Sequence, residues 1–263
     1  VQSNFSFEAI RERRLEPSIT CQDLDGFFEH VWTVHPFASL VTSEEWTSKY
    51  GEPQYYELSP SHTFIEGKVG RSGILRGLPP LNFLFSQLGI IFDLARLIRK
   101  EKINIIRAGD PLYNGLFGWA LSRLCGIPLL VRVGGNYDKN YEMTGRIEMP
   151  KLFRTRRVEK IVERFVLVRA DVVVGANQDN LNFALANGAR PETSTLFRYG
   201  NLIAKQHLDE PSVRPDGRHL LDALGVNHKG FLLTIARLES LKHLDDVVRV
   251  LAEIRQRDYD FKA

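Results

Sequence analysis

The stretch IPLLVRVGGNYD, residues 127–138, joins a short apolar run to a pair of glycines and a polar segment. Residues 127–133 have the nearly continuous apolar character of a strand that is buried on both faces of a sheet. Residues 171–174, DVVV, repeat this character. Between the two runs, apolar side chains recur at helical spacing, at Val158, Ile161, Val162 and Phe165. Strand, helix and strand in this order predict a right-handed parallel βαβ unit.

The same alternation extends in both directions along the chain. Upstream, a helical pattern over residues 82–98 precedes the β-branched run at 103–106, and a second helical pattern ends at Gly126. Downstream, Asn177 is placed to cap a helix, and residues 193–199 supply a further strand. We therefore predict the α/β class with a Rossmann-like, doubly wound parallel sheet.

The two ends of the chain are less regular. Before residue 80 we expect only a charged helix near residues 7–15, a strand at 31–34 and a polar stretch at 42–61. Residues 201–229 are rich in proline, glycine and charge, which predicts an interdomain linker.

After that linker, residues 231–235 predict one more strand, and the following helix carries Leu244, Val247, Val248, Leu251 and Ile254 on one face. Because one strand and one helix cannot bury a core, we expect residues 230–263 to be the first βα unit of a second, truncated Rossmann-like domain. Residues 1–200 then form the first domain.

Composition and charge exclude several classes of protein. The 263 residues carry a formal net charge of only +3, too small for a protein that binds nucleic acid by neutralising phosphates. The two cysteines, Cys21 and Cys125, have no CxxC spacing, so we expect neither disulfides nor a zinc site, and a cytoplasmic location. The seven histidines show no ligand spacing and predict no metal site. No GxGxxG follows a strand, which argues against a dehydrogenase.

The sequence ARLESLK, residues 236–242, lies between the predicted last strand and the last helix. It places Arg237 and Lys242 beside a helix N-terminus, where free N–H groups and the helix dipole favour an anion. Arg237 can donate paired hydrogen bonds to phosphate oxygens, and Lys242 adds a mobile charge. The pair suits a diphosphate, although the spacing alone equally fits two ordinary exposed cations.

This segment resembles the Gly-Arg-Leu-x-x-x-Lys-Gly stretch of family-4 glycosyltransferases. The similarity continues upstream in the order found in that family, at residues 97–106, 126–131, 169–174 and 198–201. It covers residues 82–263 and implies the GT-B fold, in which two Rossmann-like domains face each other. Residues 1–200 would be the acceptor-side domain and residues 230–263 the start of the donor-binding domain.

The resemblance implies a hexosyltransferase that moves a sugar from a nucleotide-diphosphate sugar to a glycan, lipid-linked or small-molecule acceptor, as in polysaccharide biosynthesis. It implies retention of configuration without a metal ion or cofactor, with Arg237 and Lys242 as catalytic residues that stabilise the leaving diphosphate. Ala236 and His243 replace the family's glycines, so this loop is bulkier. The family's sugar-binding Glu-x7-Glu loop would lie beyond Ala263, so the chain alone is expected to be incomplete and inactive.

The loop after residues 127–133 is the second candidate site. Gly134 and Gly135 would allow backbone to approach a ligand closely, and Asn136 or Asp138 would bind a sugar hydroxyl in the donor/acceptor cleft. Asp110 follows the preceding strand and is expected on the same edge of the sheet. A plain turn with capping residues remains the alternative for both loops.

Residues 151–164 form a basic segment, with Arg154, Arg156, Arg157, Lys160 and Arg164. Beside Leu152 and Phe153 they suit peripheral contact with the inner face of a membrane, as in family members that use lipid-linked acceptors. Glu159 and Glu163 favour the alternative of a solvated helix with internal ion pairs.

Two other functions stay open at this point. A GT-B-fold nucleotide-sugar epimerase would use the same diphosphate site together with acid and base side chains. A non-catalytic, partner-binding fragment is the other alternative, favoured by an apolar face over residues 244–254.

Overall fold

The computed structural model describes residues 6–198, except 13, 21–22, 25 and 38–48, and then residues 218–223, 225, 233–236, 238 and 242–256. The chain divides into two compact units. The first comprises Val1–Tyr141 and Arg146–Leu202, and the second comprises Glu142–Gly145 and Ile203–Ala263.

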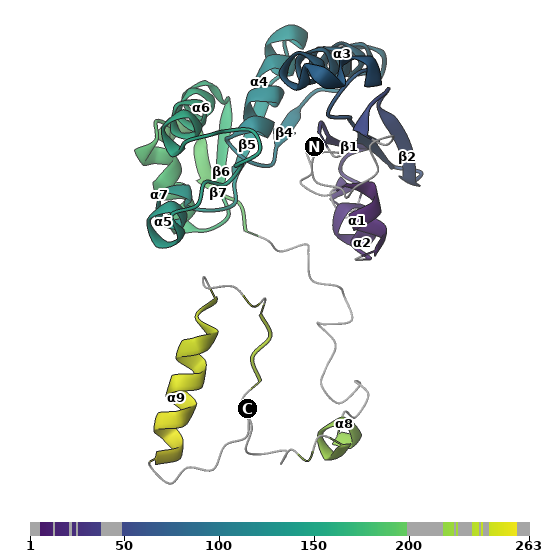
Figure 1. Ribbon diagram of the computed structural model, residues 1–263. Coiled ribbons are helices and arrows are strands. Elements are labelled where there is room, and N and C mark those ends of the chain that lie inside the picture. Colours follow the sequence, from purple (N-terminus) through teal and green to yellow (C-terminus); the bar gives the residue numbers. More distant parts are fainter. Residues whose placement is uncertain are drawn as a thin grey trace. The chain divides into compact units, whose positions relative to one another are not determined.

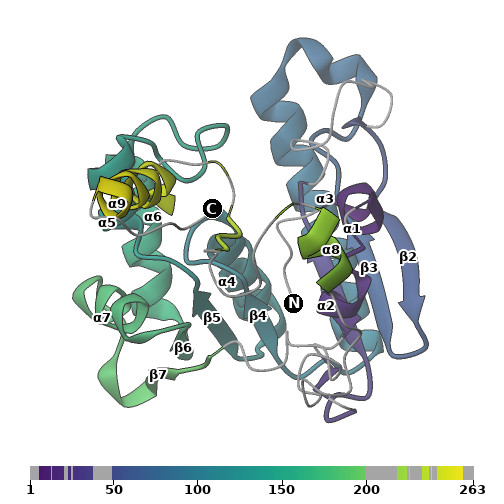
Figure 2. The ribbon, with the colours of Figure 1, turned by 90° about the horizontal axis from the view of Figure 1, so that it is seen from below.

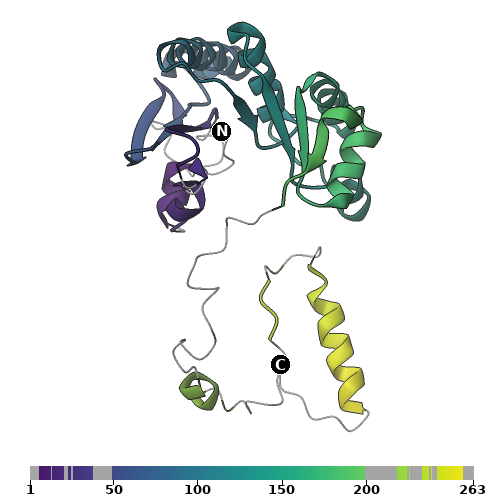
Figure 3. The ribbon, with the colours of Figure 1, turned by 180° about the vertical axis from the view of Figure 1, so that it is seen from behind.

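Four strands of the first unit form a parallel sheet in the order β4-β5-β6-β7 (Figures 1 and 3). The strands are β4 (Ile106–Ala108), β5 (Leu129–Val133), β6 (Val172–Gly175) and β7 (Ser194–Leu196). The connecting elements are α4 (Tyr113–Cys125), α5 (Tyr137–Thr144), α6 (Arg156–Arg169), α7 (Gln178–Ala186) and the short turn η5 (Pro191–Thr193). The predicted Rossmann-like parallel α/β sheet is therefore confirmed.

Capping residues set the ends of these helices. Gly126 follows α4 with φ of 70°, a left-handed conformation that glycine adopts without strain. Thr155 and Asn177 precede α6 and α7, and their side-chain oxygens accept hydrogen bonds from the N–H groups of Val158 and Asn180. These ends return the chain to the next parallel strand after a short connection.

The core of the first unit is an apolar cluster around β5. Leu129, Val131 and Val133 alternate along β5 and are at most 1% exposed. The long helix α3 (Pro79–Lys100) packs on the same cluster through Ile90, Leu94, Ala95 and Ile98. Sheet and helix thus share one apolar core, and the loops at the strand ends extend from it.

The first unit also contains a second, three-stranded sheet in the order β1-β3-β2. It comprises β1 (Val31–His35), β2 (Gln54–Ser59) and β3 (His62–Glu66), preceded by α1 (Phe7–Glu12) and α2 (Glu16–Thr20). β1 is parallel to β3, and β2 is antiparallel to it. The strand predicted at residues 31–34 is confirmed, but the hairpin of β2 and β3 was missed because its sequence is polar.

The second unit contains α8 (Arg218–Ala223) and α9 (Leu244–Gln256). The predicted last helix is confirmed as α9. The strand predicted at residues 231–235 is wrong for its described part, since residues 233–236 form no strand and Ile235 is 87% exposed. A strand needs a neighbour for its backbone hydrogen bonds, and the described residues of this unit supply none. Most of the predicted linker, 201–229, lies outside the described residues.

Candidate functional site

Three loops leave the parallel sheet at one edge. Because β4, β5 and β6 are parallel neighbours, residues 109–112, 134–136 and 176–177 all follow carboxyl ends at the same edge. The helices α4, α5 and α7 begin directly after these loops (Figure 2). In open α/β sheets ligands bind at this edge, and helix N-termini offer N–H groups to anions.

The loop after β5 has an accessible backbone. Gly134 is exposed, and a Cβ built on Gly135 would lie 3.6 Å from Nδ2 of Asn140 and 3.8 Å from Cε1 of Tyr137. These are ordinary contact distances, so packing within the protein does not require glycine at 135. The two glycines therefore leave room for a ligand to approach the backbone.

Asn136 connects this loop to the next one. Its Nδ2 donates to Oδ2 of Asp179 at 3.2 Å, and its Oδ1 accepts from the backbone N–H of Lys139 at 3.2 Å. Nζ of Lys139 also contacts Oδ1 of Asp179, at 2.5 Å. Hydrogen bonds from Lys139 and Asn136 hold the pKa of Asp179 below its ordinary value. One cation, one carboxylate and one amide thus lie together at the edge of the sheet.

Lys139 and Asp179 were not among the site residues predicted from the sequence. Asp179 lies in the first turn of α7, the position after β6 that corresponds to Asp138 after β5. Examining every strand end in the same way would have found it, because parallel neighbours bring equivalent positions together.

Asp110 is held by the first turn of α4. Its Oδ1 accepts from the N–H of Leu112 at 2.9 Å and its Oδ2 from Nδ2 of Asn114 at 2.6 Å. The residue is 3% exposed, and burial raises the pKa of its carboxyl to about 6 despite these hydrogen bonds. Asp110 lies at the expected edge, and its contacts are those of a capping residue.

Asp138 ties α5 to α6. Its Oδ1 accepts from Nη2 of Arg156 at 2.7 Å, and its Oδ2 contacts Nζ of Lys160. Burial raises the pKa of Asp138, but Lys160 and Arg156 outweigh burial and hold that pKa below its usual value. The carboxylate is therefore already engaged by two cations.

Arg156 is the centre of a larger network. Besides Asp138 it donates to Glu159 and Glu163, both at 3.0 Å, and these two acids are at most 1% exposed. Burial raises the pKa of Glu163 although Arg156 and Lys160 oppose it. Phe153 is also buried in the main cluster. Two cations and one aromatic ring of the basic segment 151–164 thus serve internal packing.

The ARLESLK segment is only partly described. Lys242 is exposed just before α9, whereas Arg237 lies outside the described residues. His243 has φ of 48°, in the left-handed region that favours glycine, at the position where the resembling motif has glycine. His243, Asp245 and Asp246 form an exposed group with ligand spacing for a metal, but both aspartates bond Arg249.

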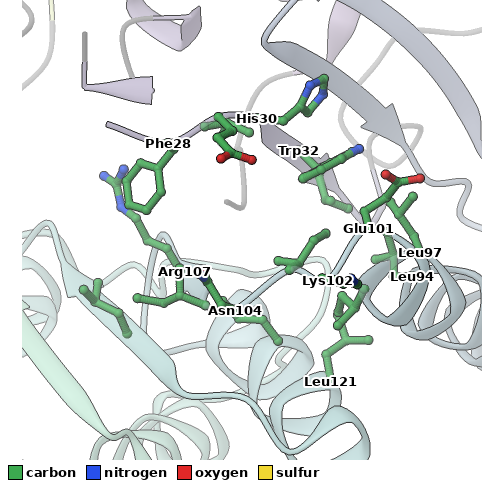
Figure 4. Close-up of a pocket in the computed structure, with 18 of the residues that line it drawn as sticks. Phe28, His30, Trp32, Leu94, Leu97, Glu101, Lys102, Asn104, Arg107 and Leu121 are labelled. Atoms are coloured by element: carbon green, nitrogen blue, oxygen red, sulfur yellow. The ribbon is translucent and has the colours of Figure 1, made fainter. Parts of the chain in front are cut away.

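A cavity of about 670 Å³ lies between β1 and β4. Figure 4 shows His30 and Trp32 on one side of it and Asn104 and Arg107 on the other. Among the described residues β1 pairs only with β3 and β4 only with β5. β1 and β4 are therefore the outermost strands of two different sheets, and the cavity lies between them. No residue of the loops after β4, β5 and β6 lines it. We therefore place the candidate site at the carboxyl edge.

No known protein family and no curated protein matches the sequence. Anabaena Alr3699/HepE in complex with UDP and glucose has a similar structure, with a TM-score of 0.56 and 15% identity over 90% of this chain and 54% of that chain. A putative UDP-N-acetylglucosamine 2-epimerase from Listeria monocytogenes gives a TM-score of 0.46 and 15% identity, over 98% of this chain and 59% of that chain. Os79 from O. sativa, in complex with UDP and deoxynivalenol-3-glucoside, gives a TM-score of 0.45 and 13% identity, over 90% of this chain and 62% of that chain.

This chain spans about half the length of the HepE structure. At such low identity the likeness shows the fold alone: the α/β fold of this chain is shared with about half of the HepE structure. Membership of family 4 stays a prediction.

Proposed function

We propose that the chain is the acceptor-side part of a GT-B glycosyltransferase, which moves a sugar from a nucleotide-diphosphate sugar to a glycan, lipid-linked or small-molecule acceptor. The observation that supports this most is the carboxyl edge of the parallel sheet. There the accessible backbone of Gly134 and Gly135 lies beside the first turns of α5 and α7. This arrangement suits an anionic, hydroxyl-rich ligand.

At this edge Asn136, Lys139 and Asp179 supply the polar groups. An amide and a carboxylate can bind sugar hydroxyls, and Lys139 can bind a phosphate oxygen after leaving Asp179. Asp110 would position the helix rather than contact the ligand, because it is buried. Asp138 would position the loop, because it is held by two cations that also bind the buried Glu163.

In the second unit we propose that Arg237 and Lys242 stabilise the charge of the leaving diphosphate, without a metal ion and with retention of configuration, as in family 4. Where transfer is measured, Arg237→Ala and Lys242→Ala should each lower turnover by about 10²–10³-fold. Normal turnover of both variants would contradict this role. A cytoplasmic place in polysaccharide biosynthesis belongs to the same proposal.

Calorimetric titration with UDP- and GDP-sugars tests the first unit. The wild-type chain should bind at least one donor, and Gly135→Val should weaken that binding at least about 10-fold because the side chain occupies the approach to the backbone. Gly77→Val is the matched control, since nothing lies within 4 Å of its Cβ and the residue is far from this edge in sequence. Equal binding by wild type and Gly135→Val would overturn the site.

In a longer form of the protein that contains the whole donor-binding domain, a labelled donor separates transfer from epimerisation. Transfer moves the label to an acceptor, whereas an epimerase yields a new sugar without one. The second result would replace the transferase proposal and keep the nucleotide-sugar site.

A further inference from the structure

Residues 72–92 form a nearly uncharged segment of the surface, made of η4 (Gly73–Gly77) and the first part of α3. Arg76 is the only charged residue in this stretch. Large apolar side chains that are between 41% and 94% exposed gather here, and we call them the α3 face: Ile74, Leu78, Leu81, Leu84, Phe85, Leu88 and Phe92. Contiguous exposure of this kind marks an interaction surface rather than ordinary surface composition.

Part of the α3 face forms a row of apolar side chains along the helix. Four of its residues follow one another at intervals of four, three and four positions and so lie in one row: Leu81, Phe85, Leu88 and Phe92. Continuing the same alternation leads to the buried Ala95 and then to Arg99, which is exposed, as is the neighbouring Arg96. Arg76 lies at the other end. The apolar row is thus bounded by cations at both ends.

The other side of α3 is fixed to the body of the first unit. Asn82 donates to the carbonyl of Ser72 at 2.8 Å, Ser86 to that of Lys68 at 2.6 Å, and Gln87 to that of Pro36 at 3.0 Å. By length and composition alone, Pro79–Lys100 is the one described helix that could span a membrane. Its polar, hydrogen-bonded inner side and its place in the core identify it instead as a helix of the folded unit.

The cations favour one kind of partner. Arg76 and Arg99 have no acidic partner among the described residues, whereas Arg96 pairs with Asp93 at 3.2 Å. No acid occurs between residues 72 and 92. An apolar row with basic ends is typical of a helix that lies in the interface of a bilayer. The row covers fewer than two heptads, whereas three or more identify a coiled coil, so the sequence does not favour a coiled coil with a second copy of the chain.

We propose that the α3 face docks on the surface of an anionic lipid bilayer. Phe85, Leu88 and Phe92 enter the boundary between headgroups and acyl chains. Arg76 and Arg99 meet lipid phosphates, and Arg96 does so after leaving Asp93. This docking does not depend on the proposed transferase activity. If both hold, it places the first unit where a lipid-linked acceptor would be found.

Flotation of the chain with vesicles of phosphatidylcholine and phosphatidylglycerol in equal parts tests the proposal. The triple variant Phe85→Ser, Leu88→Ser, Phe92→Ser should reduce the partition coefficient about 100-fold, because three apolar groups no longer leave water. The matched control removes three exposed apolar residues of α6, Val158→Ser, Ile161→Ser and Val168→Ser, and should stay within twofold of wild type. Equal loss in both triple variants, or none in the first, would overturn the proposal.

Substitution of the arginines gives a second test of the proposal. Arg96→Ser with Arg99→Ser should weaken binding to these vesicles roughly 10-fold or more and leave binding to pure phosphatidylcholine unchanged. Unchanged binding to the mixed vesicles would contradict the assigned orientation.

A reporter keeps the test valid if the triple variant unfolds. Phe92→Trp changes one exposed ring for another, and its fluorescence should shift to the blue and be quenched by brominated lipids. Ile161→Trp on α6 should show neither change. Loss of dimers on centrifugation of the triple variant, with no quenching of Phe92→Trp, would instead identify a second copy as the partner.

Discussion

α6 and α3 are both amphipathic helices with cations and exposed apolar residues, but their charges are used differently. In α6, Arg156 and Lys160 contact Asp138 and the buried Glu163, so these cations hold helices together. In α3, Arg96 and Arg99 lie at the surface beyond an apolar row. Arg96 forms an exposed ion pair with Asp93 at 3.2 Å, and Arg99 donates to the carbonyl of Leu124. Basic composition alone therefore does not identify a membrane surface, because the partners of each cation have to be known as well.

The largest expected effect concerns Arg156. Arg156→Ala leaves Glu159 and Glu163 buried without their shared cation, so the free energy of unfolding should fall by about 3–5 kcal/mol. Arg99→Ala, which removes an exposed cation from α3, should change it by less than about 0.5 kcal/mol. Urea unfolding of both variants checks the contrast, and similar losses would break the comparison.

Asp110 differs from Glu163 in being a buried carboxylate with no cationic partner among the described residues. Its pKa is raised by burial from 3.8 to about 6, so the folded state binds the proton more tightly than the unfolded chain. The stability that Asp110 contributes is therefore present at low pH and falls as pH rises from about 4 to about 6, by at most about 3 kcal/mol.

Asp110→Asn removes this titration. The unfolding free energy of the variant relative to wild type should rise with pH across that window and be level above it. Urea unfolding at several pH values measures the difference, and a constant difference would show that burial does not set this pKa.

The smallest effect is expected at the exposed pair of Lys139 and Asp179. Lys139→Met should not measurably change the unfolding temperature, because water screens an exposed ion pair. It should weaken the binding of a nucleotide-diphosphate sugar if Lys139 meets a phosphate. Calorimetry with and without the donor separates the two effects, and a large loss of stability without donor would make this pair structural like Arg156.

The parallel sheet could be predicted because its strands are continuous apolar runs and its helices have clear capping residues, as at Gly126 and Asn177. β2 and β3 could not be predicted, because polar residues occupy buried positions. His62 is 0% exposed and bonds Thr33 at 2.7 Å, while Glu66 pairs with Lys68. These polar side chains are buried because they form hydrogen bonds in the folded state, so the strand lacks the usual alternation of apolar and polar residues in its sequence.

The candidate site, too, could be predicted only in part. Gly134, Gly135 and Asp110 could be placed at one edge, since parallel topology alone brings their loops together. The engagement of Asp138 by Arg156 could not be foreseen, because it depends on how α5 packs against α6. The strand expected near Ile235 failed because its apolar pattern carries no information about a pairing neighbour.

The most direct measurement is an NMR titration of the chain with UDP- and GDP-sugars, with the backbone amides assigned. We expect the largest shifts at Gly134, Gly135 and Asn136, which follow β5 at the carboxyl edge of the sheet. Gly135→Val should reduce the shifts of Gly134 and Asn136 at equal donor concentration. Shifts confined to the cavity around Val34 and Ile105, or no shift with any donor, would contradict a nucleotide-sugar site at this edge.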